Sequence, residues 1–169
     1  MRIAFAVEGS TPAQGIWVMQ ADGKDSRVPP TSRDDTQPAW SPDGSEIAFQ
    51  RQDSPTQTDS ILVVPSGGGQ TTTLTSDLGV SDLEPAWSPD GSRILFVSDR
   101  PDTPSRDESD PAWSPDGRKI VYSANGAFHG ASSSQLYVAK ADGTQRHILT
   151  HAWGECAWIN DYPSPQPIG

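Results

Sequence analysis

The sequence predicts an all-β protein assembled from repeats, and three observations support this. Fifteen Gly and 16 Pro among 169 residues leave no uninterrupted window for a long helix. The heptapeptide Pro-Ala-Trp-Ser-Pro-Asp-Gly occurs three times unchanged, at residues 38–44, 85–91 and 111–117. A short run typical of a β-strand follows each copy. Because aromatic residues are also frequent, with six Trp, we expect a packed fold rather than disorder.

Each repeat is predicted to contain four antiparallel strands. Ser-Pro-Asp-Gly forms the turn between the first two strands, because Pro presets φ and Gly accepts conformations that a Cβ forbids. The third strand is an apolar run such as residues 61–64, and the pairs Asp22-Gly23 and Asp142-Gly143 form hairpin turns into a fourth strand. A four-stranded meander that recurs at roughly 40–50 residues is the blade of a β-propeller.

The spacing of the repeat tryptophans predicts about four blades, with the third one truncated. Trp87 follows Trp40 by 47 residues and Trp158 follows Trp113 by 45, but Trp113 follows Trp87 by only 26. The polar segment 98–110 replaces the outer hairpin of that blade and is predicted to be a loop. The fold class is therefore a partial or small β-propeller.

Thirteen strands and one domain boundary follow from this repeat. The predicted strands are 2–7, 15–20, 39–41, 46–51, 60–64, 71–75, 86–88, 93–98, 112–114, 119–124, 135–140, 147–150 and 156–159. The propeller spans residues 1–162, and the Pro-rich tail 163–169 is expected to be flexible. Strand 156–159 is the missing first strand of the N-terminal blade, and it would close the ring by pairing with residues 2–6. The alternative is that both ends are edges of a longer ring.

The repeat resembles that of the TolB-type propeller family. The shared pattern is the heptapeptide, then Arg/Lys-Ile-x-Phe/Tyr, with Ile/Leu-x-Val-x-x-Ala-Asp-Gly downstream, and it covers the chain from Arg2 to about Asp161. Such repeats occur in the periplasmic translocation protein TolB and in propeller domains of prolyl-oligopeptidase-like enzymes. The resemblance implies a non-catalytic scaffold for protein–protein or ligand binding. One alternative is a propeller fragment of a prolyl-oligopeptidase-like hydrolase or lyase that lacks its catalytic domain.

Composition excludes several function classes. Twelve basic and 22 acidic residues give a net charge of −10, which disfavours nucleic acid as a partner. No apolar stretch is long enough to span a membrane, and the single Cys156 excludes an internal disulfide. The N-terminal apolar run ends at Glu8 and is too short for a signal peptide. The expected compartment is therefore the cytoplasm, or the periplasm or exterior if the N-terminus is truncated.

No catalytic residue is predicted. The Gly-x-Ser-x-Gly motif of serine hydrolases is absent, and the glycine run 67–69 lacks the Lys of a phosphate-binding loop. The sequence thus favours a protein that is not an enzyme and that needs no cofactor.

Acidic residues precede the heptapeptides at alternate positions and raise the alternative of a cation-binding propeller. Side chains two residues apart share a face of an extended strand, so these carboxylates are expected to converge near the central channel. Clustered oxygen ligands suit Ca²⁺, and a solvated acidic rim is the competing interpretation. The candidate residues are Asp35, Asp82, Glu84, Glu108, Asp110 and Glu155.

The truncated blade predicts a partner-binding edge. Its second strand would leave backbone groups unpaired along its outer side, where another strand can add. The edge residues are Ile94, Leu95, Phe96, Val97 and Ser98. The partner would be a peptide, a protein or a second copy of the chain, and a Val97→Pro variant is expected to abolish the pairing. The alternative is that loop 99–110 folds back over the edge.

Overall fold

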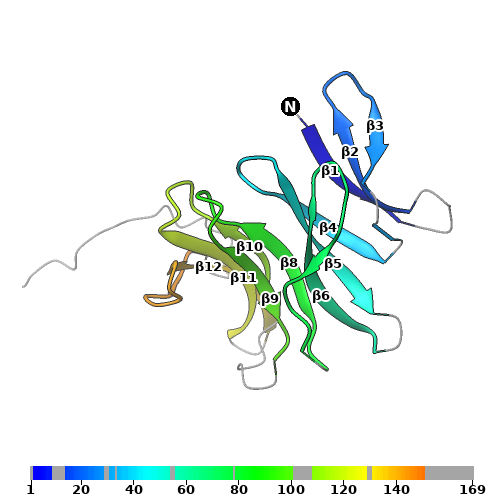
Figure 1. Cartoon of the computed structure of the whole chain (residues 1–169). Coiled ribbons are helices and arrows are strands. Elements are labelled where there is room, and N and C mark those ends of the chain that lie inside the picture. Colours follow the sequence, from blue (N-terminus) through cyan, green and yellow to red (C-terminus); the bar gives the residue numbers. More distant parts are fainter. Residues whose placement is uncertain are drawn as a thin grey trace, which may run out of the picture.

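The structure, a computed structural model, confirms the all-β prediction. It describes residues 2–8, 14–28, 31–32, 34–53, 56–77, 79–100, 108–128 and 131–150. Every regular element in these ranges is a β-strand, and Figure 1 shows the sheets following one another in chain order. The predicted strand 156–159 and the tail 163–169 lie outside the described residues, as does Glu155.

The strands form four antiparallel sheets, which we number as blades 1 to 4. Blade 1 contains β1 (Arg2–Val7), β2 (Gly15–Gln20) and β3 (Asp25–Arg27). Blade 2 contains β4 (Asp35–Trp40), β5 (Glu46–Asp53), β6 (Thr58–Pro65) and β7 (Thr72–Thr73). Blade 3 contains β8 (Asp82–Trp87) and β9 (Ile94–Ser98). Blade 4 contains β10 (Glu108–Trp113), β11 (Lys119–Phe128), β12 (Ala131–Lys140) and β13 (His147–Ile148).

The truncation of the third blade is confirmed: in the described part of the chain its sheet has two strands. A two-stranded ribbon is marginal by itself, and this one is held between its neighbours. β8 contacts β4, β5 and β6 of blade 2 on one side and β10 of blade 4 on the other. Blade 3 therefore depends on the flanking blades for its stability.

Strand bounds differ from the prediction mainly at the first strand of a blade. β4, β8 and β10 each begin four residues earlier than predicted, because pairing continues through the polar residues that precede the heptapeptide. β3 was not among the predicted strands, although the hairpin turn at Asp22-Gly23 implied it. In blade 4, β11 and β12 continue pairing through residues 125–128 and 131–134, which makes a long hairpin.

The heptapeptide turns are built identically and stack from blade to blade. In each turn the Ser hydroxyl donates to the Asp carboxylate two residues later, at 2.7 Å for Ser41–Asp43 and 2.6 Å for Ser88–Asp90. A Cβ added to Gly91 would stand 3.7 Å from the Cδ atom of Pro42 in the preceding blade, and Gly117 has the same relation to Pro89. The repeated Pro and Gly therefore serve contacts between blades as well as the turn itself.

A hydrophobic cluster of buried residues lies between blades 1 and 2. Its buried members are Ile16, Val18, Val28, Ile47, Phe49, Leu62 and Val64, and Trp40 packs against it. Burying each such side chain contributes about 1.5–3 kcal/mol, so this interface anchors the N-terminal half. No helix capable of crossing a membrane occurs within the described ranges.

Candidate functional site

The residue directly before each heptapeptide has a left-handed backbone. The φ angles of Gln37, Glu84 and Asp110 are 51°, 53° and 53°. At the same point the strand register shifts in each of blades 2, 3 and 4, as expected of a β-bulge. The expectation that side chains one and three positions before the heptapeptide share a face assumed an uninterrupted extended strand, and the bulge interrupts the strand at this point.

Asp35 is buried and fully paired. Its side chain is 0% exposed, and its carboxylate accepts Arg51 Nε at 2.6 Å and Arg51 Nη2 at 2.8 Å. The backbone N–H of Ser32 donates to the same carboxylate at 2.6 Å. The hydrogen bond to Asp35 raises the pKa of Arg51. This bidentate ion pair leaves Asp35 a structural role.

Asp82 occupies the same repeat position in blade 3 but has no arginine opposite it. Asp82 is 1% exposed, and its Oδ1 atom has no hydrogen-bond partner among the described residues. The residue across the ladder is Ser98, where blade 2 has Arg51. The truncated blade thus holds a buried carboxylate that is less well satisfied than its counterpart.

The other acidic candidates make contacts between or within blades. The backbone N–H of Asp110 donates to Glu84 Oε2 at 2.5 Å. A side chain of blade 3 thus accepts the hydrogen bond of the amide at the bulge of blade 4. Glu108 lies 3.8 Å from Arg146. Within the described part of the chain, no three His, Cys, Asp or Glu residues come together as a metal site would require.

Arginine–tryptophan contacts tie successive blades together. Arg2 lies 4.6 Å from the ring centroid of Trp40, and Arg93 lies 4.8 Å from that of Trp113. The indole Nε1 of Trp113 also donates to the carbonyl of Ala86 at 3.1 Å. The spacing in the sequence identified the repeat tryptophans but did not point to the arginines. The available signal was that both arginines directly precede an Ile in equivalent strands.

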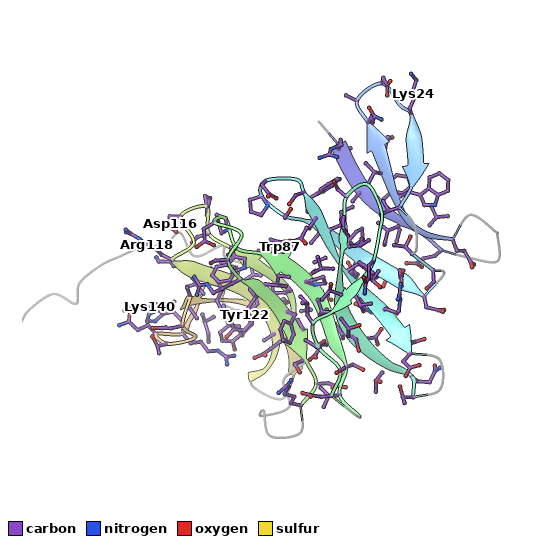
Figure 2. The ribbon with its side chains drawn as sticks, viewed as in Figure 1. Lys24, Trp87, Asp116, Arg118, Tyr122 and Lys140 are labelled. Carbon is purple, nitrogen blue, oxygen red and sulfur yellow. The ribbon has the colours of Figure 1, made fainter. Side chains whose placement is uncertain are left out.

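A groove of about 440 Å³ lies beside the truncated blade. Its lining residues come from β5, β6 and residues 72–75 of blade 2, and from β8, β9 and the turn between them in blade 3. Figure 2 shows Trp87, one of its lining residues, in the middle of the molecule. The lining is mainly apolar and consists of Glu46, Ile61, Val63, Thr72, Leu74, Thr75, Trp87, Ser92, Arg93, Ile94 and Phe96.

The backbone of β9 has one paired edge and one open edge. The carbonyl of Arg93 accepts the N–H of Ser88 at 2.9 Å, and the N–H of Asp99 donates to the carbonyl of Ser81 at 3.1 Å. Odd-numbered residues of β9 therefore direct their backbone groups toward β8, since direction alternates along a strand. Ile94, Phe96 and Ser98 direct theirs away from β8, where no described strand pairs with them.

This alternation corrects the choice of Val97→Pro as a test of the open edge. Val97 pairs with Leu83 of β8, and its backbone groups face that strand. A proline there would break the ladder inside blade 3 and would leave the open edge unprobed. Ser98 is the appropriate position, because its amide faces outward. The alternative that loop 99–110 folds back over the edge involves residues 101–107, which lie outside the described residues.

Comparison with known proteins identifies the fold. No family profile matches the chain, and no curated protein does. Among solved structures, a TolB-type protein from Agrobacterium tumefaciens superimposes with a TM-score of 0.68 at 19% identity, covering 88% of this chain and 61% of that one. This chain has the fold of a TolB-like β-propeller.

Other propellers superimpose on this TolB-like chain as well. TolB from Acinetobacter baumannii gives a TM-score of 0.67 at 18% identity, over 89% of this chain and 43% of that one. The propeller domain of the trilobed protease from Pyrococcus furiosus, which has an open velcro topology, gives 0.54 at 17% identity, over 80% and 48%. The TolB-like chain thus spans about half of the length of the TolB structures it resembles.

Proposed function

We propose that this TolB-like propeller is a non-catalytic scaffold that binds a protein or peptide strand along the open edge of β9. The observation that carries the proposal is the conjunction of two features: outward backbone groups with which no described strand pairs, and an apolar groove lined by Ile94 and Phe96 of the same strand. Strand addition uses main-chain hydrogen bonds for affinity and side-chain pockets for specificity. Both components are available at this edge.

The complete blades indicate which strand the edge would accept. Phe96 stands nine residues after its repeat tryptophan, as do Phe49 in blade 2 and Tyr122 in blade 4. Phe49 pairs with Leu62 and Tyr122 pairs with Tyr137 on the third strand of those blades. An added antiparallel strand with a large apolar residue opposite Phe96 would reproduce this pattern.

The test uses a fluorescein-labelled peptide with the sequence of β6, Thr58–Pro65, titrated with the full chain and followed by anisotropy. We expect saturable binding that Leu74→Asp weakens by about tenfold, because Leu74 lines the groove and burial of its side chain would be lost. Leu136→Asp is the matched control, since Leu136 of blade 4 is 43% exposed and Leu74 is 50% exposed. Absence of saturation, or equal effects of both variants, would contradict the proposal.

A second candidate function follows from the protease neighbour. Its propeller domain is part of a larger enzyme, and this chain could serve as the propeller portion of a hydrolase. Because such a fragment lacks the catalytic domain, the test adds the purified chain to an isolated catalytic domain of a prolyl-oligopeptidase-like hydrolase and follows cleavage of a panel of peptides. A propeller portion of the enzyme changes which peptides are cleaved, and an unrelated scaffold leaves the cleavage unchanged.

A further inference from the structure

We infer that the strand bound at the open edge is β9 of a second copy of this chain, paired antiparallel about Phe96. The inference rests on the proposed function, because it uses the same edge, and it names the partner. It makes blade 3 a symmetric interface and predicts a homodimer. The register, the charges and the strand count each support it.

The backbone pattern of β9 is compatible with pairing to itself. An antiparallel pair centred on Phe96 places that residue opposite its own copy and Ile94 opposite Ser98 of the other copy. These are the residues whose backbone groups face the open edge. Each outward-facing N–H therefore lies opposite an outward-facing carbonyl of the other copy. Each such pair exchanges two hydrogen bonds, which gives about six across the interface. A centre at Leu95 or Val97 would leave one of the three residues without its partner within β9.

Charge complementarity favours a second copy over an unrelated strand. In the register centred on Phe96, Arg93 stands opposite Asp99 of the other copy, and symmetry repeats the pair. Both residues are exposed in the single chain, where Arg93 lies over Trp113 and Asp99 accepts the N–H of Ser81 at 2.5 Å. They would occupy non-hydrogen-bonded positions of the new ladder, where side chains approach most closely and opposite charges stabilise the pair.

The resulting sheet has the size of a complete blade. Two copies of the ribbon would form the order β8-β9-β9-β8, with four strands, as in blades 2 and 4. The two Phe96 side chains would meet across the symmetry axis beside the groove, which Phe96 lines. Aromatic cross-strand pairs of this kind stabilise antiparallel sheets.

Sedimentation equilibrium of the full chain over a range of concentrations tests the inference. We expect a reversible monomer–dimer equilibrium. Arg93→Glu alone and Asp99→Arg alone should each weaken dimerisation by about tenfold, because each places like charges opposite one another twice. The double variant Arg93→Glu/Asp99→Arg should restore it. Arg118→Glu, which makes the same charge change on an exposed arginine outside β9, should leave the equilibrium unchanged.

Hydrogen exchange supplies a residue-level readout. Amides of Ile94, Phe96 and Ser98 should gain protection as concentration rises, while those of Leu95 and Val97, which face β8, should not. Ser98→Pro should abolish the dimer, with circular dichroism of the dilute protein confirming that the monomer still folds.

Three results would overturn self-association: a chain that stays monomeric at about 0.5 mM, well above the micromolar range of stable complexes, a dimer insensitive to Ser98→Pro, or a double variant that fails to recover. A monomeric chain that still binds the β6 peptide would leave the proposed function intact.

Discussion

Asp35 and Asp82 occupy one repeat position in two different electrostatic environments. Asp35 forms a bidentate ion pair with Arg51, whereas Asp82 faces Ser98 and keeps one carboxylate oxygen without a partner among the described residues. Removing one member of a buried ion pair leaves an uncompensated charge, and removing a poorly satisfied carboxylate does not. The same substitution should therefore cost much more stability at Asp35 than at Asp82.

The first prediction compares Asp35→Asn with Asp82→Asn. Asp35→Asn should lower the free energy of unfolding by about 2–4 kcal/mol because Arg51 loses its counter-charge. Asp82→Asn should change it by less than about 1 kcal/mol, or raise it, because the substitution removes a buried charge whose Oδ1 atom has no partner among the described residues. Urea denaturation of both variants measures this difference. Equal losses would show that the ion pair contributes nothing beyond the burial common to both sites.

At the scale of the element, the heptapeptide turns concentrate hydrogen bonds on single carboxylates. Asp43 accepts the Ser41 hydroxyl and the backbone N–H of Ser45, and Asp90 accepts the equivalent groups of Ser88 and Ser92. The hydrogen bonds from Ser41 and Ser88 are the main cause that lowers the pKa of Asp43 and of Asp90 to about 2. The folded turns therefore favour the ionised form of Asp43 and of Asp90 over the protonated form.

The second prediction concerns pH. Because the pKa values of Asp43 and Asp90 are lower in the folded state than the reference value of 3.8, their stabilising contribution is complete well above pH 3.8. It is lost as the pH falls from there towards 2. Asp43→Asn/Asp90→Asn keeps a turn-compatible Asn-Gly pair, so its Tm should lie below that of the unaltered chain at pH 6 and approach it near pH 2. A Tm difference that is constant across this range would contradict the assignment.

At the scale of the whole molecule, contacts between blades carry the architecture. Trp113 of blade 4 hydrogen-bonds the carbonyl of Ala86 and lies against Arg93, both in blade 3. Because the two-stranded blade 3 is marginal alone, loosening this interface should destabilise the C-terminal half of the described chain.

The third prediction follows from that interface. Trp113→Ala should lower the free energy of unfolding by about 3 kcal/mol as a large aromatic truncation. Trp113→Phe, which keeps a ring and loses the indole N–H, should cost about 1 kcal/mol. Leu136→Ala, at an exposed position, should stay within about 0.5 kcal/mol. Guanidinium denaturation measures all three, and a Trp113→Ala loss no larger than that of Leu136→Ala would place the indole outside the packed interface.

The sequence alone determined the all-β class, the repeated blade and the truncation of blade 3. Those features depend on local chemistry: Pro, Asp and Gly set the turns, and apolar runs of strand length lie between them. The open edge at residues 94–98 followed from the same counting, because a repeat that lacks its outer hairpin must leave one strand unpaired on that side. The partner that occupies the edge stays a proposal.

Only the tertiary structure decided how individual side chains are used. The bulges at Gln37, Glu84 and Asp110 interrupt the strands along which a regular backbone would align the acidic residues. The pairing of Asp35 with Arg51, and of Asp82 with Ser98, depends on register across the ladder. The hydrogen bonds of Arg93 and Asp99 to the residues that flank β8 show which amides of β9 face away from β8. The sequence gives the chemistry of each side chain. Whether two side chains contact one another depends on the distance between them, which the assembly of the strands and blades sets.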